Sequence, residues 1–410
     1  MAAVRFALEG NSMKQVNFVI SENSVYNHAG PWKRNVQFFS LDQLPTRPYI
    51  FVTGLPLNAM HDLKGQFTQE PGLLVNAGAT PQVVQDLKQS RAYCMINVYA
   101  EGWMDQGLIE PMHDYFNNMN IPLSQVIWHT NCANHKIMYD KIVTGDRVNT
   151  SYLPFFLHDY THYYKHSVVH RSDPDKHIIK PFLCFNYHHH KHRVEFFARA
   201  VKAGLFDDFY WSLPLDGYRG TYEQAMKFYF SNIEHLEVDG LTYADVATAQ
   251  AHLPQVLEPN FDRSIQENGA MAPQLYSTSL VSVVTETFFH REEIHLTEKI
   301  FKAITWRHPF VLVATSGSLA YLHTLGFKTF HEFWDESYDQ EQDHVLRMNQ
   351  IIAVLKSIAS WDQAQQRQFL LDVQPIIEHN AQLMAELAQQ LSQGQSKEYV
   401  EFLEKYGQET

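Results

Sequence analysis

The feature that most constrains the fold is an alternation of short apolar runs with stretches of helical periodicity, which occurs twice along the 410 residues. Buried strands that alternate with helices are typical of a parallel sheet whose strands are joined by right-handed helical crossovers. One alternation precedes the polar segment Arg171–His177, which contains a proline, and the other follows it. We therefore expect an α/β protein with two Rossmann-like, doubly wound domains.

The expected elements can be placed by their apolar runs and periodicity. In the first half, strands are expected over Val16–Ile20, Tyr49–Thr53, Leu73–Asn76, Ala92–Tyr99 and Gln125–His129, and helices over Pro81–Lys88 and Met104–Asn118. In the second half, strands are expected over Lys180–Asn186, Phe209–Leu213, Leu280–Glu286 and Phe310–Ala314, and helices over His192–Ala203, Thr221–Ser231, Thr297–Trp306 and Ser318–Leu325.

The last part of the chain has helical periodicity only. Ser360 is expected as a helix N-cap, and Pro375 should kink or divide the helical stretch in which it lies. These patterns predict an N-terminal domain over residues 1–172, a C-terminal domain over 173–340 and a helical extension over 341–410.

Composition narrows the possible environments and partners. The formal net charge of −13 disfavours a nucleic-acid partner, because phosphate neutralisation usually demands a basic surface. The three cysteines, Cys94, Cys132 and Cys184, form no CxxC pair and are expected to be reduced. The sequence contains no apolar run of about 18 residues, so no membrane-spanning helix is expected. Its first residues do not have the pattern of a secretion signal. We expect a cytoplasmic protein, in a host cytoplasm if a phage encodes it.

One βα unit of the second half carries a set of residues suited to a phosphorylated ligand. A strand ends at Glu286, and a helix begins near Thr297, Glu298 and Lys299. The carboxyl edge of a parallel sheet is where doubly wound folds bind ligands, and a helix N-terminus attracts phosphate. Lys299 adds a full positive charge, and Glu298 can accept hydrogen bonds from a ribose diol. Each residue also has a purely structural explanation, because acidic residues favour the first turn of any helix.

Thr297-Glu298-Lys299, with Glu286 before it and the strand HPFVLV after it, resembles the donor motif of the alpha-1,3-fucosyltransferases and, more loosely, of other GT-B glycosyltransferases. In that family the glutamate binds the ribose and the lysine binds the diphosphate of a nucleotide sugar. The resemblance implies these roles for Glu298 and Lys299. The donor would be a substrate, and no cofactor or metal ion is implied.

A second match lies upstream, in KPFLCFNYHHHKHRVEFFARAVKAGLFDD, which resembles the first strand and helix of the same donor domain. Asn186 takes the place at the strand end, and Arg193 takes that of the arginine that contacts the diphosphate. From the residues alone, Arg193 can instead pair with Glu195 or Asp207. The downstream run SGSLAYLHTLGFKTFHEFWDESYD resembles uncharacterised phage and marine-bacterial proteins that carry this domain.

Two histidine-rich segments raise the alternative of a metal site. One is His158, His162, His166 and His170, which would share one face of a helix; the other is His188, His189, His190 and His192. No cysteine accompanies the first set. We interpret the second as a polar loop near the donor phosphates, cationic when protonated, and expect no metal.

Glycosyl transfer with inversion requires a base near the acceptor hydroxyl. Glu101 and His129 are the catalytic candidates in the first domain, because each lies at a strand end. Asp105 is a further candidate base. Asn131 could contact a ligand or cap the helix that follows it. The sequence thus predicts a metal-independent glycosyltransferase that acts on a glycan or related acceptor. Two alternatives remain: a phage-type enzyme that glycosylates a hydroxymethylated base in DNA, and a non-catalytic protein that binds nucleotide sugars.

Overall fold

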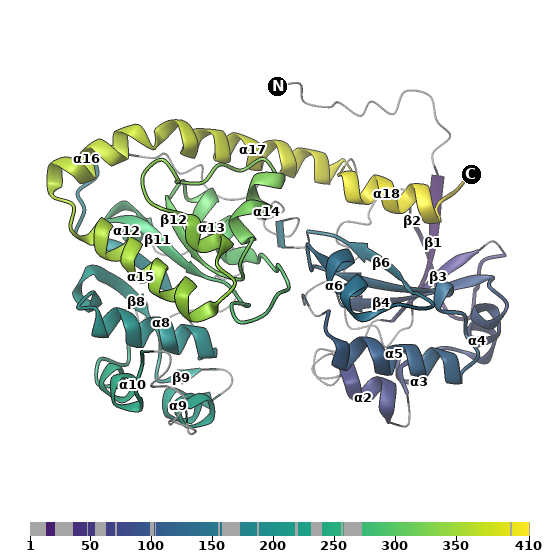
Figure 1. Cartoon of the computed structure of the whole chain (residues 1–410). Coiled ribbons are helices and arrows are strands. Elements are labelled where there is room, and N and C mark those ends of the chain that lie inside the picture. The colour runs from purple at the N-terminus through teal and green to yellow at the C-terminus, as the bar shows by residue number, and fades with distance from the viewer. Residues whose placement is uncertain are drawn as a thin grey trace. The chain divides into compact units, whose positions relative to one another are not determined.

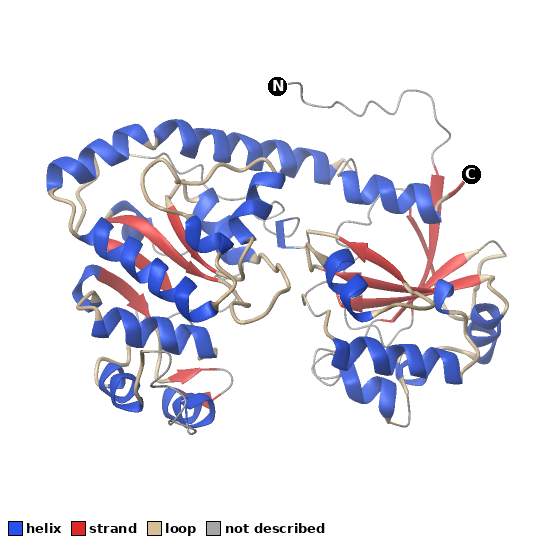
Figure 2. Cartoon of the chain, viewed as in Figure 1, coloured by secondary structure: helices blue, strands red, loops and turns tan. Residues whose placement is uncertain are grey.

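The computed structural model describes residues 14–20, 36–46, 48–53, 63–69, 72–98, 102, 104–154, 156–157, 173–186, 188–217, 220–230, 240–255, 257, 273–393 and 396–409. The chain divides into two compact units (Figure 1): unit 1 is residues 1–159 with 387–410, and unit 2 is residues 160–386. Each unit contains a parallel sheet, with helices on both faces (Figure 2), so the expected α/β class is confirmed. The helices after residue 341 are divided between the two units.

Unit 1 is built on six parallel strands in the order β2-β1-β3-β4-β5-β6, with β13 added antiparallel to β1. The strands are β1 (Lys14–Ile20), β2 (Val36–Phe39), β3 (Tyr49–Thr53), β4 (Ala92–Val98), β5 (Val126–Thr130), β6 (Asn149–Tyr152) and β13 (Gln408–Glu409). Its helices are α2 (Leu63–Thr68), α3 (Leu73–Asn76), α4 (Pro81–Lys88), α5 (Gln106–Asn118), α6 (His135–Ile142) and α18 (Lys397–Tyr406).

The two faces of this sheet are covered by different parts of the chain. On one face Val16 and Phe18 of β1 pack against Phe402 and Tyr399 of α18. The rings of Phe18 and Phe402 meet edge to face, with their centroids 6.2 Å apart. The opposite face carries the larger core, which α4 and α5 help to form. The C-terminal helix therefore completes the hydrophobic core of the unit that the N-terminal half begins.

Unit 2 is built on four parallel strands in the order β12-β11-β7-β8. The strands are β7 (Lys180–Phe185), β8 (Phe209–Ser212), β11 (Ser279–Thr285) and β12 (Phe310–Val313); a separate hairpin joins β9 (Asp216–Gly217) to β10 (Gly220–Thr221). The helices are α8 (Lys191–Lys202), α9 (Tyr222–Phe230), α10 (Tyr243–Gln250), α12 (Pro273–Ser277), α13 (Glu298–Thr305), α14 (Ser318–Thr324), α15 (His344–Ala359), α16 (Gln363–Asp372) and α17 (Gln374–Ser392).

Two local predictions are wrong. Residues Leu73–Asn76 form α3 and not a strand, because a run of three apolar residues does not distinguish the two states by periodicity. Ser360 ends α15, whereas the next helix is capped by Asp362, which forms a reciprocal capping box with Gln365. The division at Pro375 is confirmed, since α16 ends just before it and α17 begins with Gln374. None of the described helices is long and apolar enough to span a membrane.

Replacement of Phe402 by Ala should destabilise unit 1, because the ring is 4 % exposed and fills the interface between α18 and the sheet. Loss of a buried phenylalanine side chain costs about 3–5 kcal/mol. Urea denaturation of the full chain should show this loss, whereas Glu401→Ala, one residue away on the exposed face of α18, should change stability by less than about 0.5 kcal/mol. Equal effects of the two substitutions would contradict this packing.

Candidate functional site

The candidate site lies where the winding direction of the unit 2 sheet reverses. From β7 the chain crosses through α8 to β8 on one side, and from β11 it crosses through α13 to β12 on the other. Because parallel crossovers are right-handed, α8 and α13 cover opposite faces of the sheet. The carboxyl ends of β7 and β11 therefore border the crevice in which doubly wound sheets bind ligands. Asn186 and Glu286 directly follow these two strands.

Glu286 is a completely buried carboxylate, and its two oxygens bind the residue at the start of α13. The backbone N–H of Thr297 donates to Oε1 at 3.1 Å, and the Thr297 hydroxyl donates to Oε2. Burial raises the pKa of Glu286, against the opposing effects of Lys299 and of the Thr297 hydrogen bonds. The carboxylate thus fixes the N-terminus of α13 to the end of β11.

Lys299 and Glu298 form the partly exposed side of this network. The Lys299 ammonium lies 2.9 Å from the Thr297 hydroxyl and 2.9 Å from Glu298 Oε1. The side chain of Lys299 is 26 % exposed and that of Glu298 is 38 % exposed. Burial alone would raise the pKa of Glu298, but Lys299, Lys302 and a backbone hydrogen bond together outweigh burial and hold that pKa well below its usual value. A partly exposed ion pair thus lies at the N-terminus of α13, next to the buried residues Glu286 and Thr297.

Arg193 lies close to this network but does not present its charge to solvent. Arg193 is 2 % exposed. Its guanidinium donates to the carbonyls of Thr285, Glu286 and His188 at 3.2, 3.3 and 3.4 Å. These bonds join the start of α8 to the end of β11. The structure therefore gives Arg193 a structural role, and its contact with a phosphate stays a prediction.

Asn186 and His192 connect the same strand ends. The Thr285 hydroxyl donates to Asn186 Oδ1, and His192 Nε2 donates to the Glu286 carbonyl at 2.8 Å. Both residues are 3 % exposed. The sequence assigned Asn186 to the ligand, whereas its side chain here joins β7 to β11. The sequence placed His192 at the start of a helix, but it did not predict that the ring binds the end of β11.

The other described histidines of this loop contact protein groups of several kinds. His189 Nε2 donates to the Pro214 carbonyl at 2.6 Å, and the rings of His190 and His192 stack with centroids 5.9 Å apart. Beside them, His290 lies 2.9 Å from the Glu195 carboxylate, which also pairs with Lys191. Within the described ranges, no three His, Cys, Asp or Glu side chains are grouped to hold a metal ion. His158, His162, His166 and His170 lie outside those ranges.

A second helix N-terminus at this sheet edge is already occupied. The Asp339 carboxylate accepts hydrogen bonds from the backbone N–H groups of Leu319 and Ala320 at 2.9 and 3.0 Å, at the start of α14. This carboxylate takes the position that an anionic ligand would need. The start of α13 differs from that of α14 in carrying a partly exposed cation, Lys299.

The catalytic candidates of unit 1 have different outcomes. Glu101 lies outside the described residues. His129, at the end of β5, is completely buried, and its Nδ1 lies 3.1 Å from the Ser151 hydroxyl. Burial, and to a smaller extent His135, lower the pKa of His129 to about 3. A buried neutral ring does not reach an acceptor, so His129 is unsuited to be the base. Asp105 precedes α5 and is partly exposed, and Asn131 is buried.

Thr297→Val should destabilise unit 2 by about 1–3 kcal/mol, because it removes the hydroxyl that donates to the buried Glu286 and caps α13. Thr297→Ser keeps the hydroxyl and should retain most of the stability. Urea denaturation of the two variants and the parent measures the difference. If valine and serine had the same effect, the hydroxyl would not support Glu286.

The buried His129 should make stability depend on pH. An unfolded histidine has a pKa near 6.5, whereas folding lowers that of His129 to about 3. Between these values the unfolded chain binds a proton that the folded chain does not, so stability falls as pH falls, by up to about 1.4 kcal/mol per pH unit from this residue. Denaturation between pH 7.5 and 5 should show a shallower dependence for His129→Gln. A His129 ring that titrates near pH 6.5 by NMR in the folded protein would contradict this.

Comparisons with known proteins add little to this geometry. No protein-family model matches the chain, and no curated protein matches it. A solved structure described as the N-terminal domain of trehalose-6-phosphate phosphatase from Candida albicans is 9 % identical, with 94 % of this chain and 98 % of that chain covered and a TM-score of 0.34. A similarity this low supports no conclusion about function.

Proposed function

We propose that unit 2 binds a nucleoside-diphosphate sugar and that the protein is a glycosyltransferase of the GT-B type, which transfers the sugar to an acceptor hydroxyl. The observation that carries this proposal is the pair formed by Lys299 and Glu298. The pair is partly exposed, stands at the N-terminus of α13, and lies at the reversal point of the sheet. The resemblance of Thr297-Glu298-Lys299 to the donor motif of the alpha-1,3-fucosyltransferases supports the same conclusion.

The diphosphate would bind the Lys299 ammonium, beside the positive end of the α13 dipole. Both attract negative charge, and the ammonium can donate up to three hydrogen bonds. In the structure two of these are directed to Thr297 and Glu298. A partly exposed ion pair contributes only about 0–1 kcal/mol, so a phosphate can displace Glu298 from Lys299 at small cost.

Glu298, once released from Lys299, would accept hydrogen bonds from the two ribose hydroxyls. A carboxylate has two oxygens at a spacing that suits a vicinal diol, and a glutamate is ordinarily ionised at neutral pH. Glu286 is not available to the sugar, because Thr297 binds both its oxygens. Its part is to hold Thr297, and through the Thr297 hydroxyl the Lys299 ammonium, in place.

The same cation would assist the departure of the nucleoside diphosphate. As the bond from the sugar to the diphosphate breaks, negative charge increases on the leaving phosphate, and a fixed ammonium stabilises that charge without reorganisation. A proton must leave the acceptor hydroxyl at the same time. Glu101 and Asp105 remain the candidate bases, since the burial of His129 makes it unsuited to this role.

Lys299→Ala should weaken the binding of the donor about 10- to 100-fold, because it removes a charged hydrogen-bond donor to the diphosphate. Isothermal titration with UDP, GDP, ADP and CMP sugars would identify the donor and measure this loss. Lys299→Arg should keep most of the affinity, and Lys356→Ala, an exposed lysine of α15, should not change it. Equal affinities of Lys299→Ala and the parent would remove Lys299 from the site.

Release of nucleoside diphosphate from the bound sugar nucleotide, with and without acceptors, tests the catalytic part. An enzyme should show slow donor hydrolysis that Lys299→Ala reduces, while a non-catalytic binding protein should show none. An activity that requires duplex DNA with hydroxymethylated bases, and that falls steeply with salt, would support the DNA-modifying alternative.

A further inference from the structure

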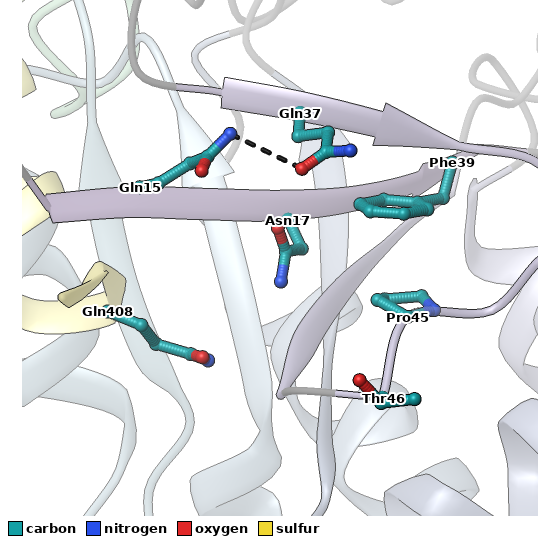
Figure 3. Close-up of a pocket in the computed structure, with 7 residues that line it drawn as sticks. All are labelled: Gln15, Asn17, Gln37, Phe39, Pro45, Thr46 and Gln408. Carbon is teal, nitrogen blue, oxygen red and sulfur yellow. Dashed lines mark hydrogen bonds between the residues drawn. The ribbon is translucent and has the colours of Figure 1, made fainter. Parts of the chain in front are cut away.

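A separate pocket in unit 1 is bordered by uncharged polar side chains. Its volume is about 200 Å³. Seven described residues line it: Gln15, Asn17, Gln37, Phe39, Pro45, Thr46 and Gln408. They come from β1, β2, the loop before β3 and the C-terminal strand β13, and Figure 3 shows Asn17, Pro45, Thr46 and Gln408 around one space. This pocket is remote in sequence from α13 and belongs to the other unit.

The register of the sheet explains why four of these side chains share one face. In the parallel pairing of β1 with β2, Asn17 lies opposite Gln37, and Val19 lies opposite Phe39. Side chains two residues apart on a strand point to the same face, so Gln15, Asn17, Gln37 and Phe39 are neighbours. The alternate residues Val16 and Phe18 face α18 and form the core. These polar residues therefore replace apolar side chains at positions that could have extended the core on their own face.

The carboxamide groups of the pocket form few hydrogen bonds with the rest of the protein. Gln15 donates to Gln37 at 3.4 Å, and Asn17 and Gln408 donate to the Pro48 carbonyl at 3.4 and 2.9 Å. Each of these bonds uses one N–H of a group that has two N–H donors and an acceptor oxygen. Two of the bonds are long and therefore weak. The pocket can thus offer both donors and acceptors to a ligand.

We propose that this pocket binds a neutral, hydroxyl-rich ligand, namely a single sugar ring of a glycan. Each hydroxyl of a sugar both donates and accepts, which matches carboxamides, and none of the seven described lining residues carries a charge that would select an ion. Phe39 and Pro45 give an apolar surface for the C–H face of the ring. The volume is smaller than the 300–1,000 Å³ typical of sites for drug-sized ligands, so it suits one ring.

The C-terminal strand is part of this site. Gln408 reaches the pocket because β13 pairs antiparallel with Lys14 and Gln15 of β1. Its side chain and that of Asn17 bind the same Pro48 carbonyl, which places both beside the loop that carries Pro45 and Thr46. The site therefore requires both ends of the chain and is independent of the donor site proposed for unit 2.

Saturation-transfer NMR on the full chain with methyl glucoside, galactoside, mannoside and fucoside tests this proposal. A ligand of this size should bind with a dissociation constant on the order of millimolar. Gln37→Ala should weaken the binding about threefold to tenfold, and Phe39→Ala should weaken it similarly. Gln85→Ala, on the exposed face of α4, is the control and should have no effect.

Three outcomes would overturn the proposal. These are the absence of saturable binding by any of the four glycosides, binding that Gln37→Ala and Phe39→Ala leave unchanged, and a preference for the uncharged nucleosides uridine or adenosine over the sugars. Gln37→Ala should keep the affinity of unit 2 for sugar nucleotides, and Lys299→Ala should keep the affinity for methyl glycosides. Failure of one site is thereby distinguished from failure of the other.

Discussion

The candidate site depends on one buried carboxylate. Glu286 has no contact with solvent, and a buried carboxylate is stable only when hydrogen bonds satisfy its oxygens. Thr297 supplies both its backbone N–H and its hydroxyl. This pair of bonds connects the end of β11 to the start of α13 across a loop of ten residues, 287–296. The positions of Glu298 and Lys299 follow from it, since they are the next two residues of the chain.

The residues of the candidate site fall into two groups: buried residues that fix its geometry, and partly exposed residues that can contact a ligand. Arg193, His192 and Asn186 bind backbone or side-chain groups at the ends of β7 and β11 and are nearly inaccessible. Only Glu298 and Lys299 of the predicted donor residues retain substantial exposure. The buried set provides preorganisation, which allows one lysine to act from a fixed position.

Elements with strong local signals could be predicted from the sequence. The strands of both sheets that consist of apolar runs are found close to the expected residues, and the helix after Thr80 begins at the predicted Pro81. The strands β2, β6 and β13 were missed. The first follows residues without a clear pattern, β6 is the polar run NTSY, and β13 has two residues, whose pairing depends on contacts distant in sequence. The assignment of α18 to unit 1 is equally a tertiary property that no local pattern encodes.

The sequence could predict which residues meet at the candidate site, but not the directions in which their side chains point. Strand ends and a helix start identify which residues meet at a sheet edge, so Glu286, Thr297 and Lys299 were expected together, as the structure has them. Whether an arginine faces a ligand or the main chain depends on the carbonyls around it, and for Arg193 two of the three lie 92 and 93 residues away. The burial of His129 likewise depends on tertiary contacts, since its ring lies beside Ser151 of β6, which is 22 residues away along the chain.

The central claim is that Thr297 positions Lys299 for a diphosphate, and a double-mutant cycle on the affinity for inorganic pyrophosphate tests it most directly. The four proteins are the parent, Thr297→Val, Lys299→Ala and the double variant. If the hydroxyl holds the ammonium in place, the two substitutions should be coupled by about 0.5–3 kcal/mol, with the double variant little worse than Lys299→Ala alone. Strictly additive losses, or pyrophosphate affinities that are the same in all four proteins, would contradict the account.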